Sequence, residues 1–74
     1  MQKEIGTYWL DVYYEVNYKI VNVWENAGSY IDITYYDVEY AKPVMTETSY
    51  RYSHEELNFD TPSTEDEYLL DSVQ

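Results

Sequence analysis

The sequence predicts an α+β fold: a small three-stranded antiparallel sheet built on a long β-hairpin, with one short C-terminal helix. Apolar and polar residues alternate over residues 8–20, which is the period of a strand with one buried face. The apolar residues of this segment are largely tyrosine, valine, leucine and isoleucine, most of which favour a pleated surface. Near the C-terminus a capping signature comes just before a leucine pair, and this pattern predicts the helix.

The hairpin is expected to span residues 8–40, with a three-residue loop at residues 26–28. Gly28 suits the left-handed position that such a loop requires. In this register the numbers of paired residues sum to 54, as they do for Trp24 and Tyr30. The first long strand therefore runs unbroken from residue 8 to the loop.

The apolar pattern changes phase in both strands of this hairpin, near residues 20–21 and near residues 34–35. Because the two changes coincide in one register, they favour a hairpin whose apolar residues switch face. The alternative is a β-bulge near Tyr35-Tyr36, which would keep all apolar groups on one side.

The expected register also places acids close together. Glu15 lies opposite Glu39, at about 5 Å across the strands, where like charges are unfavourable. Asp11 and Asp37 lie on the same face. Either the register is shifted by two residues, or the acidic face serves a function.

Residues 44–53 alternate again and predict the third strand, after Pro43 interrupts the ladder. Ser53 and Glu56 match a capping box, which predicts one helical turn over the following residues. Phe59 is expected to anchor that turn to the sheet.

The C-terminal helix is expected over residues 64–73, where Thr64 and Glu67 form a second capping box. Its first turn carries three acids, which the helix dipole favours. Its apolar stripe is expected to consist of Tyr68, Leu69 and Val73, with Leu70 beside it.

Composition predicts one small acidic domain over residues 1–74. Fifteen acids against four bases leave a net charge of −11, spread along the whole chain. Fourteen aromatic residues, eleven of them tyrosines, argue against disorder and against a halophilic surface. The chain has no cysteine, no long apolar run and no apolar signal segment, so we expect a cytoplasmic protein without disulfides.

Such a surface repels nucleic acids and membranes, since both are anionic, and attracts proteins with basic clefts. The sharper hypothesis is a nucleic-acid mimic, because carboxylates two residues apart on a strand lie about 7 Å apart, on the order of the phosphate spacing. The alternative is a solvated outer face of the sheet. The expected partner-binding residues are Asp11, Tyr13, Glu15, Asp37, Glu39, Glu65, Asp66 and Glu67.

Catalytic patterns are sparse, and we expect neither an enzyme nor a cofactor. His54, the single histidine, lacks the second histidine of a zinc-protease helix. Residues 58–69 do not match a calcium loop, because Pro62 stands at a ligand position and Leu69 at the bidentate glutamate position. With two glycines, a glycine-rich phosphate loop is not expected.

In size and composition the chain is similar to the small acidic inhibitors that phages and other mobile elements encode. The resemblance implies a cytoplasmic protein that occupies the nucleic-acid site of a host nuclease, restriction or CRISPR complex, repair enzyme or polymerase. It covers no motif and assigns no residue. The alternative function is a structural or assembly module, which self-associates as a dimer through tyrosine-rich faces and exposed strand edges.

Overall fold

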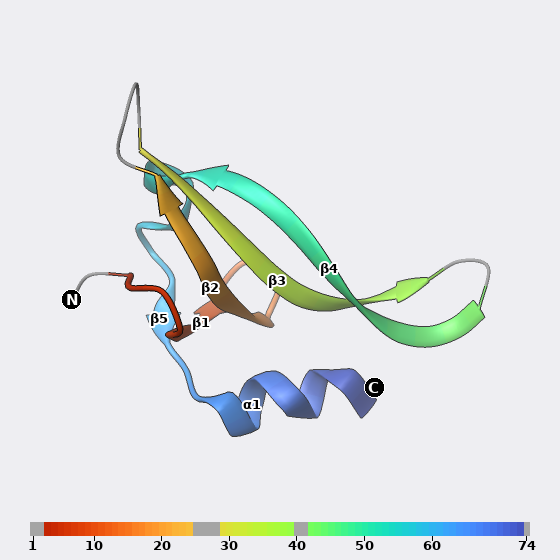
Figure 1. Ribbon diagram of the computed structural model, residues 1–74. Helices are drawn as coiled ribbons and strands as arrows, with labels where there is room; N and C mark the ends of the chain where they lie inside the picture. The colour runs from red at the N-terminus through yellow and green to blue at the C-terminus, as the bar shows by residue number, and fades with distance from the viewer. Residues whose placement is uncertain (1–2, 25–28, 40–41, 74) are drawn as a thin grey trace.

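The computed structural model describes residues 3–24, 29–39 and 42–73 (Figure 1). The α+β class is confirmed, with a mostly antiparallel sheet and one short C-terminal helix, but the sheet has five strands and not three. Its order is β4-β3-β2-β1-β5. The elements are β1 (Tyr8–Asp11), β2 (Val16–Trp24), β3 (Tyr30–Glu39), β4 (Lys42–Ser53), the 3-10 helix η1 (His54–Leu57), β5 (Thr61–Pro62), α1 (Glu65–Leu70) and the 3-10 helix η2 (Asp71–Val73).

The unbroken first strand of the expected hairpin is wrong, because the chain reverses at residues 12–15. Asp11 starts this turn: its Oδ1 accepts the backbone N–H groups of Tyr13 at 2.8 Å and Tyr14 at 3.0 Å. Its carbonyl oxygen accepts the N–H of Glu15, which takes a left-handed conformation with φ 58°. These local bonds override the alternating pattern, and β1 folds back on β2 with Trp9 opposite Tyr18.

The fifth strand is short and lies at the other edge. In β5, Thr61 pairs with Leu10 and Pro62 pairs with Trp9 of β1. An edge is where a sheet tolerates proline, since the missing N–H is not needed for a second neighbour.

Near the loop, β2 and β3 have the expected register, with Trp24 opposite Tyr30. A β-bulge at Val21 then shifts the register by one residue, so that Ile20 lies opposite Ile33. The expected change of face is therefore wrong. A bulge, in β2 and not in β3, keeps the apolar residues of both strands on one side of the sheet.

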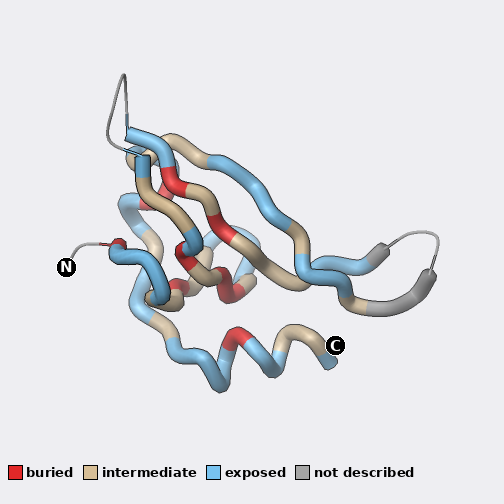
Figure 2. Tube along the Cα trace, viewed as in Figure 1, coloured by how far each residue is buried: buried red, intermediate tan, exposed pale blue. Residues whose placement is uncertain are grey.

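That side, here called the core face, carries the hydrophobic core. Figure 2 shows buried positions along the middle of β2 and β3. Leu57 of η1 covers the core, whereas Phe59, the expected anchor, is 86 % exposed. The capping box of η1 is present, because the Glu56 carboxylate accepts the Ser53 N–H at 2.8 Å. The core cluster consists of Trp9, Tyr18, Ile20, Ile31, Ile33 and Leu57.

The opposite side, here called the helix face, is covered by α1 (Figure 1). Thr64 caps the helix, accepting the N–H of Glu67 at 3.2 Å. The expected apolar stripe is wrong, because Tyr68 is the one buried residue of α1. The exposed fractions of the other three expected members are 46 % for Leu69, 55 % for Leu70 and 76 % for Val73.

The hairpin of β3 and β4 extends beyond the rest of the sheet. Tyr35 is the last residue of β3 that pairs with β2, opposite Tyr18, and the following residues pair with β4 alone. In Figure 1 this end of the hairpin projects to the right as a twisted ribbon of two strands. The fold measures 38 × 23 × 21 Å along its principal axes. The projecting ribbon and the reversed chain after Asp11 together flank a hollow on the core face.

Candidate functional site

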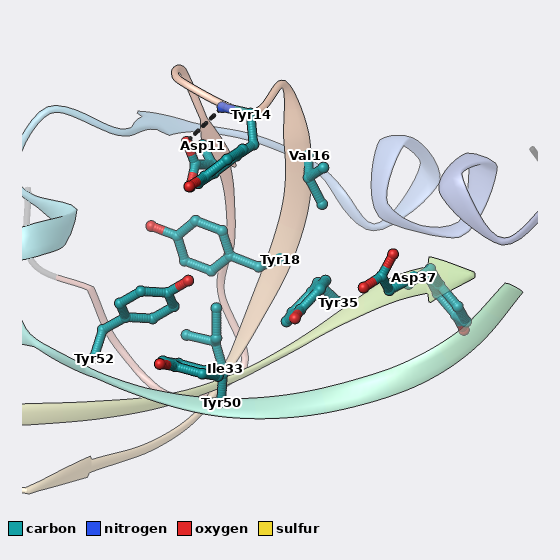
Figure 3. Close-up of a pocket in the computed structure, with 10 residues that line it drawn as sticks. Asp11, Tyr14, Val16, Tyr18, Ile33, Tyr35, Asp37, Tyr50 and Tyr52 are labelled. Carbon is teal, nitrogen blue, oxygen red and sulfur yellow. Dashed lines mark hydrogen bonds between the residues drawn. The ribbon is translucent and has the colours of Figure 1, made fainter. Parts of the chain in front are cut away.

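A cavity of about 430 Å³ opens on the core face between the β1–β2 turn and the β3–β4 hairpin. This volume lies within the range of small-ligand pockets. Two aspartates, Asp11 and Asp37, line it together with Val16 and Ile33. Its other lining residues are six tyrosines: Tyr14, Tyr18, Tyr35, Tyr36, Tyr50 and Tyr52. We refer to it as the tyrosine cavity (Figure 3).

The register of the sheet brings these rings together. Alternate residues of a strand share a face, so Tyr35 and Asp37 lie on the core face of β3, whereas the ring of Tyr36 packs against Tyr68 on the helix face. Tyr50 lies opposite Ile33, and Tyr35 lies opposite Tyr18 of β2. The rings of Tyr50 and Tyr52 are in contact, with centroids 4.6 Å apart. The cavity wall therefore combines tyrosine side chains from three strands.

Tyr18 is a fixed part of this wall. Its side chain is buried, and its hydroxyl donates a hydrogen bond of 2.6 Å to Oδ2 of Asp60. Burial raises the pKa of Tyr18, and the bond to Asp60 raises it further. Burial also raises the pKa of Asp60, against the opposing effect of the Tyr18 bond. At neutral pH the phenol stays protonated and its orientation is set by one acceptor.

The two aspartates that line the cavity each use one carboxylate oxygen to accept backbone N–H groups. Oδ1 of Asp11 accepts the two N–H groups of the β1–β2 turn, and Oδ1 of Asp37 accepts the N–H of Val38 at 2.8 Å. Among the described residues no hydrogen bond reaches Oδ2 of either aspartate. In Figure 3, Asp11 lies beside Tyr14 at one end and Asp37 lies at the other.

The negative charge of the aspartates acts on the tyrosines between them. Burial raises the pKa of Tyr35, and the nearby Asp37 raises it further. Burial also raises the pKa of Tyr52, to which Tyr35 and then Asp11 add. Both effects hold the phenols neutral, because a phenolate would add a charge to a site that already carries two carboxylates.

None of the described lysine and arginine side chains lines the tyrosine cavity. Each of them instead lies over an aromatic ring elsewhere. Nζ of Lys3 lies 4.2 Å from the ring centroid of Trp9. Nζ of Lys19 lies 5.9 Å from the ring centroid of Tyr8. The guanidinium carbon of Arg51 lies 5.4 Å from the ring of Trp24.

Arg51 occupies a site built from an aromatic ring and a carboxylate, on the helix face. Its Nε lies 2.6 Å and its Nη2 3.1 Å from the two oxygens of Asp32. The indole N–H of Trp24 also donates to Asp32, at 2.8 Å. The hydrogen bond from Arg51, then that from Trp24, lowers the pKa of Asp32. The pair is bidentate, which is the strongest arrangement of arginine with a carboxylate.

The structure separates the expected partner-binding residues into three places. Asp11 and Asp37 share the tyrosine cavity. Tyr13 and Glu15 are exposed in the β1–β2 turn and lie outside any strand. The acids of α1 are exposed on the other side of the sheet, in the first turn of the helix: Glu65, Asp66 and Glu67.

The expected pairing of Glu15 with Glu39 is wrong. Glu15 lies in the turn, and the backbone of Glu39 pairs with Lys42 of β4. The side chain of Glu39 lies outside the described part of the structure. Glu15 and Glu39 are therefore not cross-strand partners as the unbroken hairpin implied.

Sequence reasoning missed the aromatic wall of the site. The alternation of residues 44–53 predicts that Tyr50 and Tyr52 share one face of that strand, which agrees with their ring contact. Tyr18 lies opposite Tyr35 because of the bulge, which shifts the register of β2 against β3 by one residue. The available signal was the alternation of tyrosine in three segments, which indicates a tyrosine-rich face but not a hollow.

Comparison with known proteins finds no matching family model, no similar curated protein and no similar solved structure. In the described ranges no helix reaches the length and hydropathy of a membrane span. The same ranges contain no group of three histidine, cysteine or acidic side chains placed to hold a metal ion.

Proposed function

We propose that the chain is a non-enzymatic inhibitor that mimics nucleic acid and binds a basic, nucleic-acid-handling protein in the cytoplasm. One observation supports this proposal best. The net charge is −11, and the described lysines and arginine are all placed over aromatic rings of the protein itself. The surface therefore offers a partner mainly carboxylates and tyrosine rings, which basic clefts bind.

In this proposal the carboxylates replace phosphates and pair with lysine and arginine of the partner. Tyrosine rings supply rigid contact area between the charges. Charge complementarity accelerates association and makes it sensitive to salt, because screening weakens the attraction between exposed charges. The resemblance to acidic inhibitors of mobile elements suggests a defence nuclease, a restriction or CRISPR complex, a repair enzyme or a polymerase as the target.

Affinity capture followed by competition tests this function. We expect the tagged protein to retain a nucleic-acid-binding protein from a bacterial lysate at about 0.05 M NaCl and to release it at about 0.5 M. Added duplex DNA should displace the captured protein, and the purified inhibitor should block its DNA binding at equal molar ratio. Capture that persists in high salt, or a partner that binds DNA and this chain simultaneously, would contradict the proposal.

Two charge-matched variants identify the surface that the partner uses. Glu15→Gln with Asp37→Asn removes two charges on the cavity side, and Glu65→Gln with Asp66→Asn removes two on α1. Because both double variants change the net charge equally, a larger loss of affinity in one of them locates the interface. Equal small losses would indicate long-range attraction without a defined contact surface, and would contradict a mimic with specific contacts.

A second candidate function, self-assembly, is favoured by the composition of β4. This edge strand of 12 residues has a net charge of +1, from Lys42 and Arg51 against Glu47, in a chain of charge −11. Antiparallel pairing of two β4 strands about Ser49 would place Glu47 opposite the Arg51 of the second copy. Sedimentation between about 5 and about 500 μM tests it, since a two-fold dimer gains mass with concentration. A constant monomer mass would exclude it.

A further inference from the structure

We propose that the tyrosine cavity is a receptor for an arginine side chain of the basic partner. The inference deepens the proposed function, on which it rests for the source of that arginine. The binding chemistry of the cavity itself is independent of the partner's identity and is tested without it.

The protein contains its own example of this chemistry. Arg51 is bound by one carboxylate, Asp32, and one aromatic ring, Trp24, at the opposite face of the sheet. The tyrosine cavity repeats these parts in larger number, with two aspartates and with tyrosines of three strands: Tyr18, Tyr35, Tyr50 and Tyr52. It lacks the cation, since no described lysine or arginine reaches it. A guanidinium group from outside would complete the arrangement.

Charge and hydrogen bonding favour a cation over other ligands. Asp37 and Asp11 repel anions, and their Oδ2 atoms are acceptors without donors among the described residues. Burial raises the pKa of Tyr35, and the charge of the nearby Asp37 raises it further. A cation placed against Tyr35 would therefore lie beside a carboxylate. Aromatic rings bind cations over their faces, because the quadrupole of the ring makes the face negative.

The geometry of the wall favours arginine over lysine. A guanidinium group is planar, stacks on aromatic rings and offers two parallel N–H groups to one carboxylate. The ammonium group of lysine is compact and strongly hydrated, so it loses more on entering an aromatic site. The cavity volume of about 430 Å³ leaves room for a complete arginine side chain, and Tyr35, Tyr50 and Asp37 are among the residues that line it.

The site is also organised before a ligand arrives. Tyr18 is held by Asp60, and Asp11 is held by the two N–H groups of the β1–β2 turn. The ring of Tyr14 is supported by an edge contact with Tyr13, with centroids 4.8 Å apart. A preformed wall lowers the conformational entropy lost on binding, so affinity does not depend on ordering a loop.

The test measures binding of two fluorescent hexapeptides, one of arginine and one of lysine, by anisotropy at about 0.15 M NaCl. We expect the arginine peptide to bind at least about fivefold more tightly than the lysine peptide, because only guanidinium combines stacking with bidentate pairing. Equal affinities for the two peptides would overturn the proposal, since simple charge attraction does not distinguish them.

A matched pair of variants separates the cavity from the general acidity of the chain. Asp37→Asn should weaken the arginine peptide by about threefold to fivefold, through loss of an exposed charge-assisted pair. Asp66→Asn on α1 removes the same charge from the other face and should change affinity by less than about twofold. Equal losses in the two variants would overturn the assignment of the site.

Tyr50→Leu provides a second variant that leaves the net charge unchanged. This half-exposed ring contributes to the wall without supporting the core, so the variant is expected to fold. We expect it to weaken the arginine peptide by about threefold and to leave the lysine peptide nearly unaffected. An unchanged affinity for the arginine peptide would argue against a stacked guanidinium.

The two proposals fail in different ways. If the arginine peptide binds through Asp37 but no nucleic-acid-handling protein is captured, the inhibitor function fails and the arginine site remains. If a partner is captured and Asp37→Asn binds it as tightly as the unaltered protein, the arginine site fails and the inhibitor function remains.

Discussion

The attachment of α1 through a single tyrosine leads to a sharp prediction about stability. Tyr68 packs between the rings of Tyr8 and Tyr36, at centroid distances of 5.3 Å and 5.1 Å. Its hydroxyl donates to the Glu47 carboxylate at 2.6 Å and, having one proton, accepts from Thr34 at 2.9 Å. Burial raises the pKa of this hydroxyl, and the bond to Glu47 raises it further, so the donor persists at neutral pH.

The magnitude follows from these contacts. Tyr68→Phe keeps the ring and removes both hydrogen bonds, and since Glu47 can still reach water we expect a loss of about 1–2 kcal/mol. For a domain of this size that loss lowers Tm by roughly 4–16 °C. Tyr68→Ala also removes a buried ring, at about 3–5 kcal/mol, which approaches the whole stability of a chain this short. We therefore expect Tyr68→Ala to be largely unfolded at room temperature.

Thermal unfolding followed by circular dichroism measures both variants, with Leu70→Ala as the control. Leu70 is 55 % exposed, so its removal should cost less than about 0.5 kcal/mol. A cycle of Tyr68→Phe and Glu47→Gln then isolates the contribution of the carboxylate charge to this contact, because the amide oxygen of glutamine can still accept the hydroxyl. If Leu70→Ala destabilised the protein more than Tyr68→Phe, the helix would be held by an apolar stripe, and the attachment argued from Tyr68 would be refuted.

Three further predictions concern the turn and two buried polar groups. Glu15→Gly should stabilise the protein by about 0.5–1 kcal/mol by relieving the left-handed φ, whereas the charge-matched Glu15→Gln should not; urea midpoints compare them. Asn17→Ala removes the side-chain bonds from β2 to Ser63, the Glu67 carbonyl and Asp71, and should lower the urea midpoint by an equivalent of about 2–3 kcal/mol. Burial raises the pKa of Asp60 in the folded protein above its pKa in the unfolded chain. The contribution of Asp60 to the free energy of unfolding is therefore present at low pH and is lost as pH rises through the pKa of the folded protein. Asp60→Asn should thus gain stability relative to the unaltered protein between about pH 3 and about pH 7 in urea titrations, and a constant difference across that range would contradict this.

Local signals in the sequence were sufficient for part of the fold. The pairing of Trp24 with Tyr30 followed from the loop chemistry alone. The capping box at Ser53 and the cap at Thr64 marked where two helices begin, because a helix start depends on neighbouring residues. These features are set within a few residues along the chain.

The rest of the fold depended on side-chain hydrogen bonds that compete with the alternating pattern and that the pattern itself does not reveal. The alternating pattern continues through residues 12–15, so nothing in it indicates that the Asp11 carboxylate captures the following N–H groups. Tyr68 displaced the leucines as the anchor because its hydroxyl finds Glu47, which lies 21 positions away.

The candidate site, like the fold, was predicted only in part from the sequence. Asp11 and Asp37 were expected on one face, and they line one cavity. The cavity itself required the reversal after Asp11 and the bulge at Val21, two irregularities that decide which tyrosines meet. The binding role of these aspartates and of the α1 acids stays a prediction.

The order of strands in the sheet has a consequence for how the chain acquires its structure. Strands β1 to β4 are neighbours both in sequence and in the sheet, so each pairing closes a short loop, a topology associated with rapid folding. The exception is the C-terminal segment, which crosses back to the first hairpin, where Asn17 bonds to Asp71 across 54 positions. During synthesis the meander can form while the helix face is still bare, and the face is covered only when the later residues of α1 have been made. Until then Tyr8 and Tyr36 remain exposed to water, so the newly made sheet is most prone to aggregate in this interval.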